Sequence, residues 1–121
     1  YVLKDFPLSF HKESQKAHEA AHCAGDEGKY WEMNKKLFAS QSGLGLSELK
    51  KYAGEVKLNA KKFEECLDSG KYAERVQKNT QQGSEIGVTG TPVFFINGRM
   101  LSGARPFESF KEIIDSELSK D

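Results

Sequence analysis

Residues 87–98 read GVTGTPVFFING and contain the strongest local signals in the chain. The β-branched and aromatic run after Pro92 is typical of a strand, because such side chains fit a pleated surface. Asn97-Gly98 is the preferred two-residue turn of a β-hairpin, since both of its positions must adopt positive φ. We therefore expect a strand over Pro92–Ile96, a tight turn, and a return strand over Arg99–Ser102.

The Thr91–Pro92 bond has two possible interpretations. Proline is confined to strand starts, edges and bulges, so it can simply open the strand in the common trans form. A cis bond would instead create a bend that leaves the backbone of Thr91 exposed. Such a backbone could pair with an extended ligand.

Upstream, apolar and small residues recur with the helical period for about eighty residues. Gly25 and Gly70 are expected to end two of these helices, and Ser47 and Asn59 to cap the starts of two others. The residues expected to face a core are Ala17, Ala20, Ala21 and Ala24; Tyr30, Trp31, Met33 or Asn34, Leu37 and Phe38; Leu49, Tyr52, Ala53 and Val56; Ala60, Phe63 and Leu67; and Tyr72, Ala73, Val76 and Thr80.

The two ends of the chain complete the pattern. Tyr1–Asp5 predicts a short strand, ended by the Phe6-Pro7 turn. An opening this apolar belongs inside a sheet, so we expect that something upstream has been removed. After Pro106, a last helix is expected to present Phe107, Phe110, Ile114 and Leu118 on one face. The order of elements predicts an α/β or α+β layer with a helical block inserted.

Composition narrows the classes of function. With 121 residues, the chain is expected to form one domain with its own core. Lys+Arg and Asp+Glu both number 18, and this balance argues against nucleic acid as the main partner, because phosphate binding needs a basic surplus. No apolar stretch approaches the roughly 18–20 residues of a membrane span. We expect no cofactor.

Residues 18–22, HEAAH, match the H-E-x-x-H pattern of zinc peptidases on a predicted helix. His18 and His22 would share a face and could bind zinc, with Glu19 as general base. The third ligand position of the longer pattern holds Gly28, which cannot coordinate. The simpler interpretation is a set of polar residues flanking the alanine stripe, so we expect no metal site and keep the zinc peptidase as a remote alternative.

Several separate motifs occur in a recognisable order. KDFPL spans residues 4–8, AAHCA residues 20–24 and GKYWEM residues 28–33, and GVTGTP is followed by LSGARPF at residues 101–107. Taken together, the chain resembles the DsbA-like family of thioredoxin-fold thiol:disulfide oxidoreductases.

The resemblance implies an α/β, thioredoxin-like fold in a single domain over residues 1–121. Residues 1–8 and 87–121 would form the thioredoxin core, and residues 9–86 the inserted helical domain. Gly90, Thr91 and Pro92 would bind substrate through a cis-proline loop, with Gly90 allowing close approach.

The chain also departs from the family. Members begin with a strand and a helix that carries a Cys-x-x-Cys pair, whose first cysteine is the nucleophile because the helix N-terminus lowers its pKa. Residues 1–121 contain neither element, so no catalytic residue can be carried over. The missing strand would lie between Tyr1–Asp5 and Pro92–Ile96 and leave unpaired edges, which predicts dimerisation, strand exchange or a separate fragment that fills the gap.

The two cysteines, Cys23 and Cys66, lie far apart in the sequence. From the residues alone they are either two buried thiols or one disulfide. The resemblance favours a structural disulfide, because the family works outside the cytoplasm, where disulfides persist, and some members carry an extra bridge. It also implies a periplasmic or secreted location.

The resemblance thus implies disulfide exchange on exported proteins, with extended or unfolded polypeptides as substrates and a redox protein as partner. This chain alone is expected to be catalytically inactive and to retain the docking loop. The alternative is a redox-inert peptide-binding or assembly module that uses the same loop.

Overall fold

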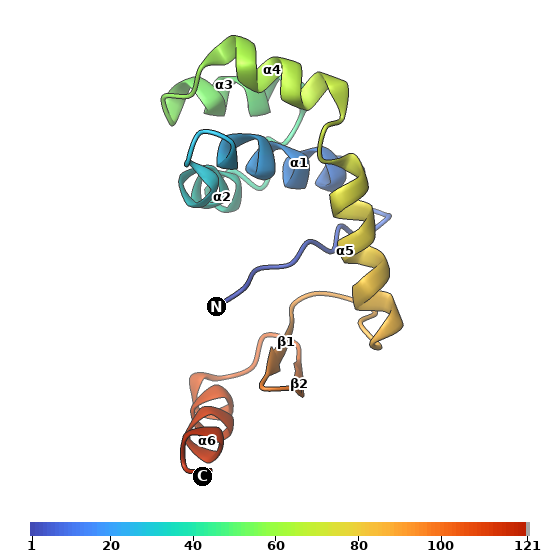
Figure 1. Ribbon diagram of the computed structural model, residues 1–121, viewed down its shortest axis with the longest axis vertical. Helices are drawn as coiled ribbons and strands as arrows, with labels where there is room; N and C mark the ends of the chain where they lie inside the picture. Colours follow the sequence, from blue (N-terminus) through green and yellow to red (C-terminus); the bar gives the residue numbers. More distant parts are fainter. Residues whose placement is uncertain (121) are drawn as a thin grey trace. The chain divides into compact units, whose positions relative to one another are not determined.

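A computed structural model describes residues 1–120 (Figure 1). The chain divides into two compact units, Tyr1–Gln82 and a second that begins at Gly83. Each is described by itself. The assignment of residues 1–8 and 87–121 to one thioredoxin core, interrupted by residues 9–86, stays a prediction.

The first unit is helical and is built around its first helix. α1 contacts each of the next three helices, and α3 also contacts both α2 and α4 (Figure 1). The fifth helix, α5, runs across the boundary between the units. The bounds are α1 Ser14–Gly25, α2 Tyr30–Ala39, α3 Leu46–Glu55, α4 Ala60–Ser69 and α5 Ala73–Glu85.

The alanine stripe of α1 explains why this helix can lie among three others. Ala17, Ala20, Ala21 and Ala24 are all buried, and their small side chains let neighbouring backbones approach closely. The larger side chains that fill the core come from the surrounding helices. These fully buried residues are Met33, Leu49, Phe63 and Leu67.

The observed helix ends agree in part with the capping residues that the sequence predicted. The Asn59 side chain accepts a hydrogen bond from the backbone N–H of Lys62, as expected of an N-cap, and Gly70 ends α4 in the left-handed conformation. The Ser47 prediction is wrong: the N-cap of α3 is Gly45, two residues earlier, and the helix begins at Leu46. The hydroxyl of Ser47 binds the Glu48 carboxylate instead of a backbone N–H.

The strand predicted over Tyr1–Asp5 does not form in the described residues. A strand needs a hydrogen-bonded neighbour, and no described segment pairs with these residues. Only Asp5 of this segment is buried, and Tyr1 and Val2 are largely exposed.

The second unit consists of a hairpin and one helix. β1 (Val93–Ile96) pairs antiparallel with β2 (Arg99–Ser102), and Asn97 and Gly98 both have positive φ, as the predicted turn requires. The strand starts at Val93, one residue later than predicted. α6 (Phe107–Leu118) contacts the hairpin through Phe110, whose ring meets that of Phe94 edge-on at 4.8 Å.

Three aromatic positions are more exposed than the sequence predicted. Trp31 and Phe38 were expected in the core, yet they are 55% and 65% exposed, because α2 buries only Met33 and Leu37. Phe107 on α6 is 73% exposed. An apolar position with helical spacing marks a face, but burial depends on a second element covering that face.

Candidate functional site

The loop that enters the hairpin is the first candidate site. Its peptide bond Thr91–Pro92 is cis. Val88, which is buried, anchors the start of the loop, and its N–H donates to the carbonyl of Gly83 at 2.9 Å. At the other end the N–H of Gly103 donates to the carbonyl of Pro92 at 2.8 Å, which extends the hairpin ladder by one bond.

Between these anchors the loop presents unpaired backbone. Thr91 and Pro92 are exposed, and within residues 1–120 the N–H and C=O of Thr91 have no hydrogen-bond partner. Gly90 has open space where a side chain would project. An extended polypeptide could therefore lie against the loop and exchange main-chain hydrogen bonds with Thr91, as strands do when they add to a sheet edge.

The two cysteines are joined to each other. The Cys23–Cys66 disulfide has an S–S distance of 2.07 Å and a Cα–Cα distance of 5.9 Å, and it links α1 to α4. Cys23 is buried, and the described residues contain no free cysteine. The disulfide therefore lies among the core helices, and neither of its cysteines is available as a nucleophilic thiolate.

A cluster of polar side chains around Asp5 was not expected from the sequence. The buried carboxylate of Asp5 binds Nδ1 of His18 at 3.0 Å and Nε2 of His22 at 2.5 Å. The side-chain amide of Asn79 donates to it at 3.2 Å. The Asp5 cluster, made of these four residues, thus ties the N-terminal segment to α1 and α5.

The electrostatics of Asp5 follow from these contacts. Burial alone would raise the pKa of Asp5, but hydrogen bonds from His18 and His22, together with their charge, outweigh it and hold that pKa well below its usual range. The ring of His22 also packs near two tyrosine rings, with its centroid 5.5 Å from that of Tyr30 and 5.4 Å from that of Tyr72. The imidazole is therefore fixed on several sides.

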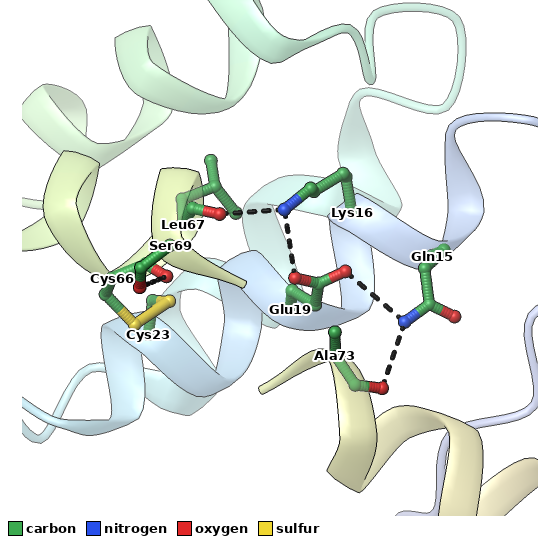
Figure 2. A network of polar contacts seen from close by, with 8 residues as sticks. All are labelled: Gln15, Lys16, Glu19, Cys23, Cys66, Leu67, Ser69 and Ala73. Carbon is green, nitrogen blue, oxygen red and sulfur yellow. Dashed lines mark hydrogen bonds and ion pairs between the residues drawn. A yellow bond between two sulfur atoms is a disulfide. The ribbon is translucent and has the colours of Figure 1, made fainter. Parts of the chain in front are cut away.

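The same contacts bear on the zinc-peptidase pattern. His18 and His22 both point at Asp5, whereas the carboxylate of Glu19, which is buried, binds Lys16 at 3.1 Å and Gln15 at 3.3 Å (Figure 2). Lys16 in turn donates to the carbonyl of Leu67 at 2.7 Å. Over residues 1–120, no three His, Cys, Asp or Glu side chains are placed to hold a metal ion. In this arrangement the polar side chains of the H-E-x-x-H pattern bind Asp5, Lys16 and Gln15.

The chain thus has a helical unit followed in the sequence by a cis-proline loop that leads into a β-hairpin. The comparisons place this chain in the thioredoxin class. The model of the DSBA-like thioredoxin domain matches residues 2–115, and the chain belongs to that family.

Two solved structures show the same fold. One is α-DsbA1 of Wolbachia pipientis, with a TM-score of 0.79, 24% identity, and coverage of 96% of this chain and 66% of that one. The other is a thioredoxin-like oxidoreductase of Silicibacter pomeroyi, with a TM-score of 0.76, 17% identity, and coverage of 98% and 68%. The fold is thus the thioredoxin-like DsbA fold, mostly helical with a small antiparallel sheet.

The curated relatives are much longer proteins. Na(+)/H(+) antiporter NhaA 1 of Salinispora arenicola is 36% identical over 120 residues, which are 98% of this chain and 18% of that protein. Antiporter NhaA of Herminiimonas arsenicoxydans is 28% identical over 116 residues, 96% of this chain and 18% of that protein. The chain therefore spans about a fifth of the length of these relatives. No helix within residues 1–120 is long and apolar enough to cross a membrane.

Proposed function

We propose that this domain takes part in thiol–disulfide exchange on extended polypeptides and that Gly90, Thr91 and Pro92 dock the client chain. The observation that carries the proposal is the unpaired backbone of Thr91 in an exposed loop whose two ends are fixed by hydrogen bonds. Membership of the DSBA-like family supports the proposal of thiol–disulfide exchange.

The exchange step needs a thiolate that residues 1–121 do not offer, since Cys23 and Cys66 are bonded to each other. We propose that a Cys-x-x-Cys pair outside this sequence supplies it. Its first thiolate attacks a client disulfide sulfur, forms a mixed disulfide and releases the other client sulfur as thiolate; its second thiolate then displaces the client. A redox protein restores the pair, and an extracytoplasmic location suits this chemistry.

The alternative function is a redox-inert peptide-binding module, which would use the exposed backbone of Thr91 in the same way. Both functions require the client chain to dock at the loop, but only the first requires disulfide exchange. Partner pairing along the open edge of β1 also stays a prediction, as in a strand-exchanged oligomer.

A bulky side chain at Gly90 tests the docking role. Gly90 has no atom within 4 Å of the place where a Cβ would lie and does not need positive φ, so Gly90→Leu is expected to fold normally. The leucine would occupy the space over Thr91 and break its main-chain bonds to a client. We expect about tenfold weaker binding of an unfolded protein that has been reduced and alkylated with iodoacetamide, measured by fluorescence anisotropy.

Gly54 on α3 provides the matched control. It is exposed and also has free space around a Cβ, so Gly54→Leu adds the same side chain far along the sequence from the loop. This variant should bind the unfolded protein as the wild type does. If wild type, Gly54→Leu and Gly90→Leu bind the unfolded protein with equal affinity, the loop does not dock the client chain.

A further inference from the structure

The tip of the hairpin is a two-residue turn with an asparagine directly before a glycine. Asn97 and Gly98 form the whole turn, because Ile96 and Arg99 are the last residues that pair between β1 and β2. Both turn residues are exposed. Asn97 is the one asparagine of the chain that precedes a glycine. Its side-chain amide therefore stands next to a backbone nitrogen that no side chain of its own residue hinders.

The sheet does not hold the nitrogen of Gly98. Within residues 1–120 the N–H of Gly98 has no hydrogen-bond partner, and the ladder begins only at the pair Ile96 and Arg99. Apart from its two chain neighbours, no residue has an atom within 4 Å of the place where a Cβ of Gly98 would lie. The turn can therefore change its backbone conformation without breaking a ladder bond or displacing another part of the fold.

The same turn is connected to α6 through Glu117. The Glu117 carboxylate pairs with Arg99 at 3.7 Å and with Lys120, and its side chain is 10% exposed. A hydrogen bond from Lys120, and a weaker effect of one from the Asn97 side chain, hold the pKa of Glu117 below its usual value, although burial opposes them. Position 97 therefore suits a neutral amide, whereas a carboxylate there would face a second carboxylate.

We propose that Asn97 is a modification site at which the protein deamidates spontaneously, and that the product loosens the hairpin from α6. The backbone nitrogen of Gly98 gives up its proton to solvent base and attacks Cγ of Asn97. A new N–C bond forms, the bond from Cγ to the amide nitrogen breaks, and ammonia leaves with a proton from solvent. Water then opens the cyclic imide at either carbonyl to give aspartate or isoaspartate. Water is the co-reactant, and nothing is oxidised or reduced.

The product is less compatible with the hairpin than asparagine is. Aspartate and isoaspartate both bring a negative charge beside Glu117, where like charges repel. Isoaspartate also adds a methylene group to the main chain. The two-residue turn fixes the register of β1 and β2 through positive φ at Asn97 and Gly98, so a longer main chain does not fit it. We therefore expect the ladder to open more often after the reaction.

The test compares two asparagines in one peptide. The folded protein is incubated in heavy-oxygen water at mildly alkaline pH and then digested with trypsin in ordinary water, so only deamidation during the incubation carries the isotope. Cleavage after Lys78 and Arg99 releases a peptide that contains both Asn79 and Asn97. Its fragment ions give the two rates from the same sample.

Asn79 is the matched control, because it lies within α5, precedes Thr80 and already donates a hydrogen bond from its side chain. We expect Asn97 to react at least about tenfold faster than Asn79, which corresponds to a barrier lower by about 1.4 kcal/mol. Isoaspartyl methyltransferase with S-adenosylmethionine should label the incubated wild type. It should not label Asn97→Gln, whose longer side chain must close a larger ring.

Hydrogen exchange followed by mass spectrometry tests the effect on the hairpin. Amides of residues 93–102 should exchange faster in the deamidated protein than in fresh protein, and Asn97→Asp, which adds the charge alone, should show part of that increase. Equal rates at Asn97 and Asn79, or reaction at Asn97 only after unfolding in urea, would overturn the modification site. Unchanged exchange over residues 93–102 after deamidation would overturn the loosening of the hairpin.

Discussion

The variant Cys23→Ala/Cys66→Ala is expected to lose about 4 kcal/mol of unfolding free energy. The disulfide closes a loop between residues separated by 43 positions, and the chain-entropy relation for a loop of that length gives this value. The physical reason is that the cross-link restricts the unfolded chain far more than the folded one. Urea unfolding followed by circular dichroism measures the change as a lower midpoint.

The prediction has two controls. Reduction of the wild type should reproduce the loss while keeping both sulfur atoms, which separates the cross-link from the space vacated by the buried Cys23 side chain. Ser69→Ala removes an exposed hydroxyl that donates to the carbonyl of Cys66 and should cost no more than about 0.5 kcal/mol. If the double variant stays within about 1 kcal/mol of wild type, the bridge does not hold the helices together.

Asp5→Asn is expected to cost about 3 kcal/mol at neutral pH. The change keeps the size of the side chain but replaces one acceptor oxygen by an NH₂ group that faces imidazole nitrogens, and it removes a buried charge that three donors surround. Breaking one member of a buried, hydrogen-bonded cluster leaves the others without partners, and that penalty sets the size of the effect. Urea unfolding again provides the measurement.

Asp68→Asn is the matched control. Asp68 is paired with Lys50 at 3.3 Å, but its side chain is 52% exposed, so the same substitution should cost no more than about 0.5 kcal/mol. A cost for Asp5→Asn as small as that of Asp68→Asn would show that the Asp5 cluster contributes little.

The Asp5 cluster also makes the stability of the folded protein depend on pH. The pKa of Asp5 is lowered in the folded protein relative to the unfolded chain, where an aspartate has a pKa of about 3.9. Its contribution is therefore present above about pH 4 and is lost as the pH falls through the lower, folded value. The stability difference between wild type and Asp5→Asn should shrink steadily below pH 4, and a difference that grew in acid would contradict the sign.

The hairpin and the helices could be predicted because their signals are local. Asn97-Gly98 specifies a turn through φ, Asn59 caps a helix with its own side chain, and the small residues of α1 mark a close contact. Each of these features depends on residues within a few positions of each other. The cis form of the Thr91–Pro92 bond could be named as an alternative, and the family motifs favoured it.

What could not be predicted depends on distant partners. The Asp5 cluster joins residues from three segments, and no spacing in the sequence links Asp5 to Asn79. The H-E-x-x-H pattern correctly indicated that His18 and His22 share a helix face, but not that a buried carboxylate meets them there. The expected strand at Tyr1–Asp5 and the expected burial of Trp31 failed for a similar reason, since pairing and burial need a second element.

The most direct test of the proposed role in disulfide exchange is the intact mass of the native protein from its source, before and after alkylation with and without reductant. We predict a mass well above the 13.6 kDa of residues 1–121 and two reducible cysteines beyond Cys23 and Cys66. A mass of 13.6 kDa with only these two cysteines labelled after reduction would contradict the exchange chemistry, and the peptide-binding module would take its place.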